Sequence, residues 1–112
     1  MSDCIFCKLA SGEIPTDMVC ENDLAAAFRD ANPQAPVHVL IVPKAHHDNI
    51  LDNVDAQTLA AMTELVGEVA RREGIDKTGF RVIMNTGADA RQTVMHLHMH
   101  VLGGTEMGEG LL

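Results

Sequence analysis

The segment "TVMHLHMHVLGG", residues 93–104, places His96, His98 and His100 at alternate positions with apolar residues between them. Successive side chains of a β-strand point to opposite faces, so an extended segment turns all three imidazoles to one face and Leu97, Met99 and Val101 to the other. Two glycines then mark an end for the strand. We therefore predict a strand over residues 93–102 with one apolar face and one face of histidines.

The rest of the chain predicts an antiparallel sheet around this strand. Asp55 is placed to cap a helix that continues to about Glu73, with Gly74 as its C-terminal stop. A short helix is expected within "CIFCKLASGEIP", ended by Gly12. Further strands are predicted at residues 23–28, 37–43 and 79–85. We expect one α+β domain over residues 1–112, an antiparallel β-sheet of about five strands with one long and one short helix.

Composition excludes several classes of function. Eight basic and sixteen acidic residues give a formal charge of −8, which argues against binding a nucleic-acid polymer. A small anionic ligand is compatible with this charge, because backbone N–H groups can hold one phosphate locally. No apolar run approaches the length of a membrane span, and the N-terminus lacks the pattern of a signal peptide. We expect a cytoplasmic protein that does not bind membranes.

Spacing alone leaves two interpretations of the three histidines. In a strand, neighbouring histidines are ~6.6 Å apart and the outer pair ~13 Å, whereas metal–nitrogen bonds are only about 2.0–2.1 Å, so one metal ion held by all three is a poor fit. One interpretation is a solvated polar face, which serine, threonine or lysine would serve equally well. The other, which we favour, makes His98 a nucleophile or base, with the outer pair orienting it and donating to an anion.

The chain as a whole resembles the histidine triad (HIT) superfamily. "QTVMHLHMHVLGG" is similar to its His-x-His-x-His signature, and "CIFCKLASGEIP", "AFRDANPQAPVHVLIVPKAH" and "RVIMNTGAD" are similar to other family blocks in family order. Together they extend from Cys4 to Gly104. Gln92 and the Gly103–Gly104 pair resemble the branch of histidine triad nucleotide-binding proteins more than the dinucleoside polyphosphate hydrolases.

The resemblance implies a homodimeric hydrolase or nucleotidyl transferase. It implies cleavage of purine nucleoside phosphoramidates, or similar adenylates, through a nucleotidyl group carried on a histidine. Two alternatives stay open: a dinucleoside polyphosphate hydrolase on the same scaffold, and a nucleotide-binding regulatory module with incidental catalysis. The physiological substrate, the leaving group and any protein partner are not implied.

The resemblance also implies roles for individual residues. His98 matches the nucleophile, His100 the group that hydrogen-bonds the phosphate and leaving group, and His38 a fourth active-site histidine. The implied substrate-binding residues are Asp30 for the ribose, Asn85 and Thr93 for the phosphate, Gln92 with no more specific role, and Ile5, Phe6, Leu9 and Phe28 around the base. Each has an alternative outside this family: Asp30 could begin a turn, and Phe6 and Phe28 could be core residues.

A possible zinc site begins at the N-terminus. Cys4-x-x-Cys7 supplies half of such a site, a weak signal alone. The resemblance implies that Cys4, Cys7, His46 and His96 hold a structural Zn²⁺, with no metal needed for the chemistry. A Cys₂His₂ set would close a tetrahedron and leave no open position. The alternative is a pair of ordinary buried thiols.

Two departures from the family pattern stand out. Family members commonly have two glycines where this chain has Ala90–Arg91, a change that alters the loop or adds the Arg91 charge near the anion. The tail "GTEMGEGLL" is short and lacks the tryptophan found in well-known relatives, in which the tail reaches toward the site of the partner subunit. That difference bears on the choice of leaving group.

Overall fold

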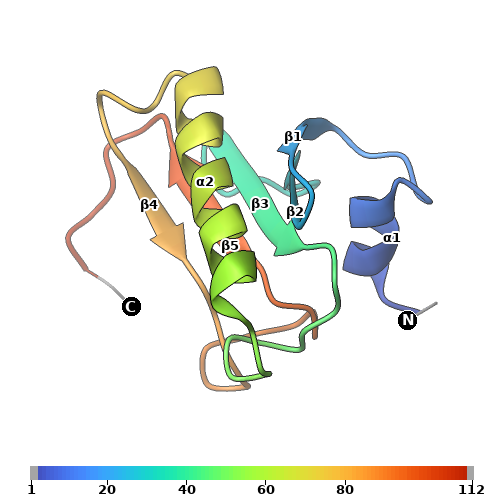
Figure 1. The fold of residues 1–112 in the computed structure, drawn as a ribbon. Coiled ribbons are helices and arrows are strands. Elements are labelled where there is room, and N and C mark those ends of the chain that lie inside the picture. The colour runs from blue at the N-terminus through green and yellow to red at the C-terminus, as the bar shows by residue number, and fades with distance from the viewer. Residues whose placement is uncertain (1–2, 111–112) are drawn as a thin grey trace.

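A computed structural model describes residues 3–110, which form one five-stranded antiparallel sheet and two helices (Figure 1). The elements follow in the order α1 (Ile5–Ser11), β1 (Met18–Glu21), β2 (Ala25–Arg29), β3 (Val37–Pro43), α2 (Ala56–Arg72), β4 (Phe80–Ile83) and β5 (Met99–Gly103). The strand order is β1-β2-β3-β5-β4, and each neighbouring pair is antiparallel. The predicted fold class is confirmed; the predicted domain ends, residues 1 and 112, lie outside the described residues.

Local capping chemistry sets the helix ends. The Asp55 side chain accepts a hydrogen bond from the Thr58 backbone N–H at 2.7 Å and so caps α2, while Gly74 follows with a φ of 72°. Cys4 caps α1, and Gly12 ends it in the left-handed conformation with a φ of 85°. Both predicted helices are confirmed. In the part of the chain that the structure describes, no helix is long and apolar enough to cross a membrane.

The two helices cover opposite faces of the sheet. Leu65 and Val69 of α2 pack on one face over β1, β2 and β3, together with Leu97, Met99 and Val101. Phe6 of α1 packs on the other face in a smaller cluster that also contains Ala10, Ala26, Phe28, Leu40 and Val42. β2 is therefore buried on both sides, which explains its uninterrupted apolar run.

Strand bounds differ from the predictions. The strand expected at 23–28 lies at 25–29, and the one expected at 79–85 contains only residues 80–83. β1 was not predicted; it has only four residues, and its pairing with β2 shifts register between Met18 and Cys20. A segment this short becomes a strand because its neighbour pairs with it, which leaves little pattern in its own sequence.

The prediction of a strand from residue 93 was wrong, because β5 begins only at Met99. The partner strand β3 ends at Pro43, which has no N–H to continue a ladder. The carbonyl of Pro43 instead accepts a hydrogen bond from the side chain of His96 at 2.8 Å. Alternation nevertheless continues through the segment: His96 and His98 approach Phe6 on one face, while Leu97 packs with α2 on the other.

Candidate active site and metal cluster

A cavity of about 450 Å³ opens where α1 meets the end of β2 and the histidine segment. It is lined by eight of the predicted site residues: Ile5, Phe6, Leu9, Phe28, Asp30, Thr93, His98 and His100. The lining therefore combines apolar side chains with two imidazoles, a hydroxyl and a carboxylate. This combination suits a ligand with a flat apolar part and a polar, anionic part.

One ring nitrogen of His98 is hydrogen-bonded to the backbone, and the other has no hydrogen-bond partner among the described residues. Its Nδ1 lies 2.7 Å from the carbonyl oxygen of His96. A carbonyl can only accept, so Nδ1 carries the proton and Nε2 of the neutral ring keeps a lone pair. No buried side-chain nitrogen or oxygen among residues 3–110 lacks a partner. Since no described residue bonds Nε2 of His98, that atom must be open to the cavity.

Phe6 holds the His98 ring in place. The two ring centroids are 5.0 Å apart with an interplanar angle of 85°, an edge-to-face contact. Phe6 also meets Phe28 edge-on at 5.8 Å. With only 7% of His98 exposed, the unpaired nitrogen lies on a fixed ring.

His100 and His38 form a pair beside His98. The centroids of His98 and His100 are 4.9 Å apart, and Nε2 of His38 lies 2.9 Å from Nδ1 of His100. Burial lowers the pKa of His100 to about 4, and the nearby His98 and His38 add to this effect. Burial also lowers the pKa of His38, partly offset by Asp30. Both rings of this pair are therefore uncharged at neutral pH.

Asp30 borders the cavity beside this pair. Its Oδ1 accepts a hydrogen bond from the Asn32 backbone N–H at 2.8 Å, which holds the turn after β2. Its Oδ2 lies 3.4 Å from Nε2 of His38. Asp30 therefore both begins a turn and lines the cavity, so the two interpretations of this residue are compatible.

Two of the predicted substrate-binding residues lie away from the cavity lining. Gln92 is buried and organises its own loop: its side chain accepts from the Gly87 N–H and donates to the carbonyls of Asp48 and Val94. Asn85 follows β4 and does not line the cavity either. His38 is not in the lining but lies directly behind His100.

Arg91 is exposed and is not part of the lining. Its φ of 64° is unusual for a residue with a side chain. The loop before the histidines thus has an arginine in a conformation that glycine adopts more easily.

The cavity also contains residues that the sequence analysis did not select: Pro15, Thr16, Arg29, Ala31, Leu40 and Val94. Leu40 could have been found, because it lies two residues after His38 on β3 and so shares its face. Pro15 and Thr16 lie in the connection from α1 to β1, where no periodic pattern indicates a position.

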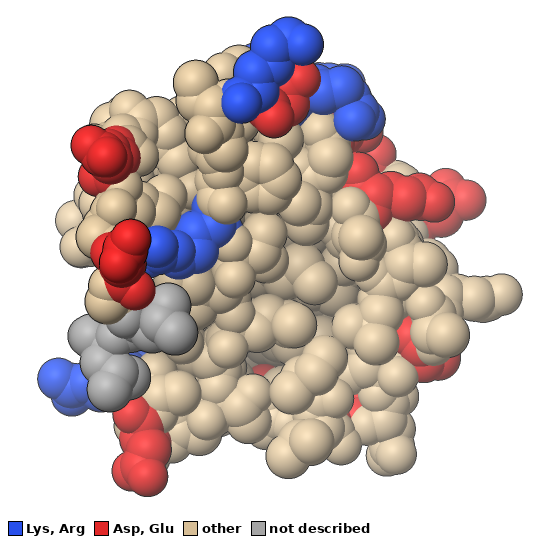
Figure 2. All heavy atoms as spheres, turned by 90° about the vertical axis from the view of Figure 1, so that its left-hand side faces the viewer, with Lys and Arg blue, Asp and Glu red and all other residues tan. Residues whose placement is uncertain are grey.

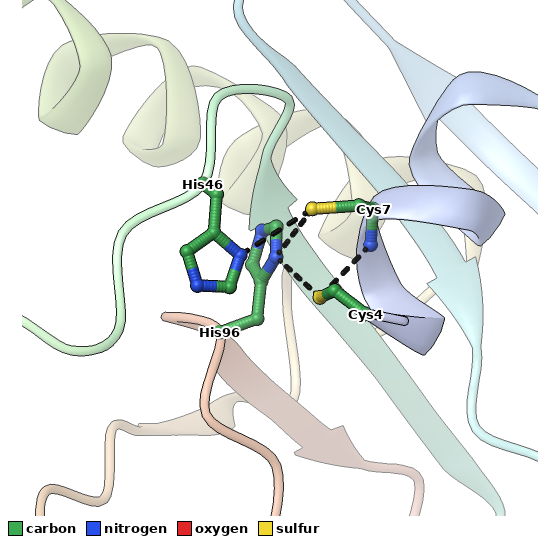
Figure 3. Close-up of side chains that lie close together, drawn as sticks. All are labelled: Cys4, Cys7, His46 and His96. Carbon is green, nitrogen blue, oxygen red and sulfur yellow. Dashed lines mark hydrogen bonds between the residues drawn. The ribbon is translucent and has the colours of Figure 1, made fainter. Parts of the chain in front are cut away.

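A second cluster consists of Cys4, Cys7, His46 and His96 (Figure 3). Nδ1 of His96 lies 3.2 Å from Sγ of Cys4 and 3.4 Å from Sγ of Cys7. Nδ1 of His46 lies 3.4 Å from Sγ of Cys7. All four donor atoms are within 4.8 Å of one another, so the predicted ligand set comes together.

These distances fit a tetrahedral zinc site. Bonds of about 2.3 Å to sulfur and 2.0–2.1 Å to nitrogen place sulfur and nitrogen roughly 3.5 Å apart around one ion. The far nitrogens of both imidazoles are also held. Nε2 of His96 donates to the Pro43 carbonyl, and Nε2 of His46 donates to Oδ1 of Asp48 at 2.8 Å. Such outer hydrogen bonds leave the Nδ1 lone pairs directed at the centre of the cluster.

Comparison with known proteins agrees with this geometry. A family model described as the HIT domain matches residues 11–107. The chain is 45% identical over 107 residues to the purine nucleoside phosphoramidase of Escherichia coli (strain K12), an alignment that covers 93% of this chain and 89% of that protein. It is 40% identical over 110 residues to the 14 kDa zinc-binding protein of Brassica juncea, covering 94% and 96%. The solved structure of a HIT family hydrolase from Clostridium thermocellum matches with a TM-score of 0.94 and 42% identity, covering 100% of this chain and 99% of that one.

Proposed function

The chain belongs to the HIT domain family, and we propose that it hydrolyses purine nucleoside phosphoramidates through a nucleotide bound covalently to His98. One observation carries the proposal: His98 presents an unpaired Nε2 to the cavity while its Nδ1 proton is held by the His96 carbonyl. A neutral imidazole in that form is a nucleophile at neutral pH. The similarity to a purine nucleoside phosphoramidase supports the choice of substrate.

The cavity walls suit the parts of such a substrate. The apolar side made by Ile5, Phe6, Leu9 and Phe28 accepts a purine face. The carboxylate of Asp30 can accept hydrogen bonds from two ribose hydroxyls. That placement brings the α-phosphate between Thr93 and the His98–His100 pair.

The reaction then takes two displacements at phosphorus. The Nε2 lone pair of His98 forms a P–N bond as the substrate's own P–N bond breaks. The leaving amine takes the electron pair of that bond and a proton from water in the open cavity. Water next attacks the same phosphorus and loses a proton to solvent, and His98 leaves with its electron pair. Two easier steps thus replace one difficult displacement.

Replacing His98 with alanine tests this proposal. We expect turnover of an adenosine phosphoramidate to fall by at least 10³-fold while adenosine monophosphate still binds. His47→Ala is a matched control, because His47 lies outside the cavity lining and its Nδ1 bonds the Asp52 carbonyl. Faster turnover of a dinucleoside polyphosphate would favour the other hydrolase assignment. A cellular role that survives His98→Ala would favour the regulatory one.

We also propose that the cluster of Cys4, Cys7, His46 and His96 holds a structural Zn²⁺. Four protein donors leave no open position, so the metal would contribute no step at phosphorus. It would instead attach α1, which carries Phe6, to the segment before His98. Purified protein should contain one zinc per chain, and Cys4→Ser should lose it. Cys20→Ala should keep it, because Cys20 lies beneath α2. Equal zinc in all three proteins would contradict the assignment.

A homodimer is proposed from the surface beside β4. β4 is an edge strand; Phe80 and Val82 on it and Met84 directly after it are 38%, 40% and 39% exposed. Figure 2 shows this side of the molecule, where most surface atoms belong to residues that are neither acidic nor basic. A second copy would cover an open edge and an apolar row together. Val82→Glu should sediment as a monomer. Leu24→Glu should remain a dimer, because Leu24 is exposed and lies near the edge of the sheet opposite to β4. A dimer that persists in Val82→Glu would place the interface elsewhere.

A further inference from the structure

The ring of His38 accepts a hydrogen bond from a backbone amide. The N–H of Gln34, in the loop between β2 and β3, donates to Nδ1 of His38 at 3.0 Å. An amide N–H cannot accept a hydrogen bond, so Nδ1 of His38 must offer a lone pair. A neutral His38 therefore carries its proton on Nε2.

The proton on Nε2 of His38 determines the tautomer of His100. Nε2 of His38 lies 2.9 Å from Nδ1 of His100, so Nδ1 of His100 must accept. A neutral His100 then carries its own proton on Nε2, the edge that remains on the cavity side. The hydrogen bonds point one way, from the Gln34 amide through His38 to His100.

We propose that the Gln34 backbone N–H is a positioning group that fixes His100 as an uncharged Nε2–H donor toward the phosphate. The part that concerns the phosphate rests on the proposed function, whereas the proton positions do not. A second proton on His100 would occupy Nδ1 and face the Nε2–H of His38. His38 could relieve this only by moving its proton to Nδ1, where the Gln34 amide already donates. Either arrangement sets two donors against each other.

The charged groups around the pair agree with this form. His98 and His38 face His100 and oppose a positive charge on it, and burial acts in the same direction. Asp30 is the facing group that favours a positive charge on His100. Nε2 of His38, however, lies 3.4 Å from Oδ2 of Asp30 and only 2.9 Å from Nδ1 of His100. The direct β4 neighbour of His100 is the apolar Ile83. The environment therefore supports a neutral ring.

A neutral donor has a definite chemical consequence. An uncharged imidazole can stabilise negative charge on a phosphoryl oxygen without giving up its proton. Activity should then persist as the pH rises from 6 to 8, where an imidazolium acid would lose its proton. The leaving amine must obtain its proton from water, which matches the open cavity.

Long-range ¹⁵N NMR of the histidine rings tests the proton positions without substrate. We expect His38 and His100 in the Nε2–H form from pH 8 to pH 5.5. A proton on Nδ1 of either ring, or an imidazolium at His100 at pH 7, overturns the proposal. Correct proton positions with no phosphoramidate turnover would contradict only the proposed function.

Two substitutions at one position separate the amide from the side chain. Gln34→Pro removes the N–H, whereas Gln34→Ala keeps it and removes a side chain whose amide donates to the Asn32 carbonyl. In Gln34→Pro, His38 and His100 should each populate both tautomers. The pKa of His100 should rise by at least one unit, and the pH profile of kcat should change. Gln34→Ala should match the wild type in all three. Identical spectra and profiles in both variants refute the proposal, and the wild-type spectra decide it if Gln34→Pro does not fold.

Discussion

Replacing His100 with asparagine should make the stability of the protein less sensitive to acid. The pKa of His100 is about 4 in the folded protein, against 6.5 for the ordinary side chain, mainly because the ring is buried. Between these values the unfolded chain binds more protons than the folded one, so stability is lost as the pH falls through this window. Asparagine does not titrate, and its amide oxygen can still accept the hydrogen bond from His38.

The magnitude follows from the two pKa values. One pKa unit corresponds to about 1.4 kcal/mol. Between pH 7.5 and pH 4.5 the wild type should therefore lose about 2–3 kcal/mol more unfolding free energy than His100→Asn. Burial also lowers the pKa values of His38 and His96, but both proteins share these groups, so their contributions largely cancel in the difference.

Urea unfolding at four pH values between 7.5 and 4.5 measures this difference. The chain contains no tryptophan or tyrosine, so far-ultraviolet circular dichroism is the suitable signal. His47→Asn serves as a control for the loss of a histidine that lies outside the pair. If the pH-dependent change in unfolding free energy differs by less than about 1 kcal/mol between the wild type and His100→Asn, the claim that His100 is buried and uncharged is refuted.

Four further outcomes are expected. Phe6→Ala should weaken nucleotide binding at least tenfold and destabilise the fold by about 3 kcal/mol, measured by calorimetry and urea unfolding, because the ring is both cavity wall and core. Arg91→Gly should be more stable than Arg91→Ala by about 1 kcal/mol, since the φ of 64° suits glycine. Gly103→Ala should cost about 1–3 kcal/mol, because an added Cβ would lie 2.8 Å from Cδ1 of Ile75. If Cys4 is a ligand of the proposed Zn²⁺, a chelator should lower the thermal midpoint of the wild type and leave that of Cys4→Ser unchanged.

Features that depend on neighbouring residues were predicted well. The α2 cap at Asp55 and its glycine stop are local chemistry, and both are found as expected. The alternation of imidazoles and apolar residues also holds, because any extended backbone alternates its side chains. The gathering of Cys4 and Cys7 with two histidines required the family resemblance, since these residues are distant in sequence.

Features that depend on distant pairing were predicted less well. β1 is a strand because β2 pairs with it, and β5 starts late because β3 ends at a proline. The contact between His38 and His100 spans 62 positions, and the amide behind His38 belongs to a loop with no periodic pattern. Sequence spacing could suggest that these histidines belong to one site, but not which nitrogen of each holds a proton.

The most direct test of the account is mass spectrometry of the enzyme stopped in alkaline denaturant during turnover of an adenosine phosphoramidate. We predict one adenylyl group per modified chain, located on the peptide that contains His98 and absent from His98→Ala. An adenylyl group on any other residue, or undiminished turnover by His98→Ala, would contradict the claim that this imidazole attacks phosphorus.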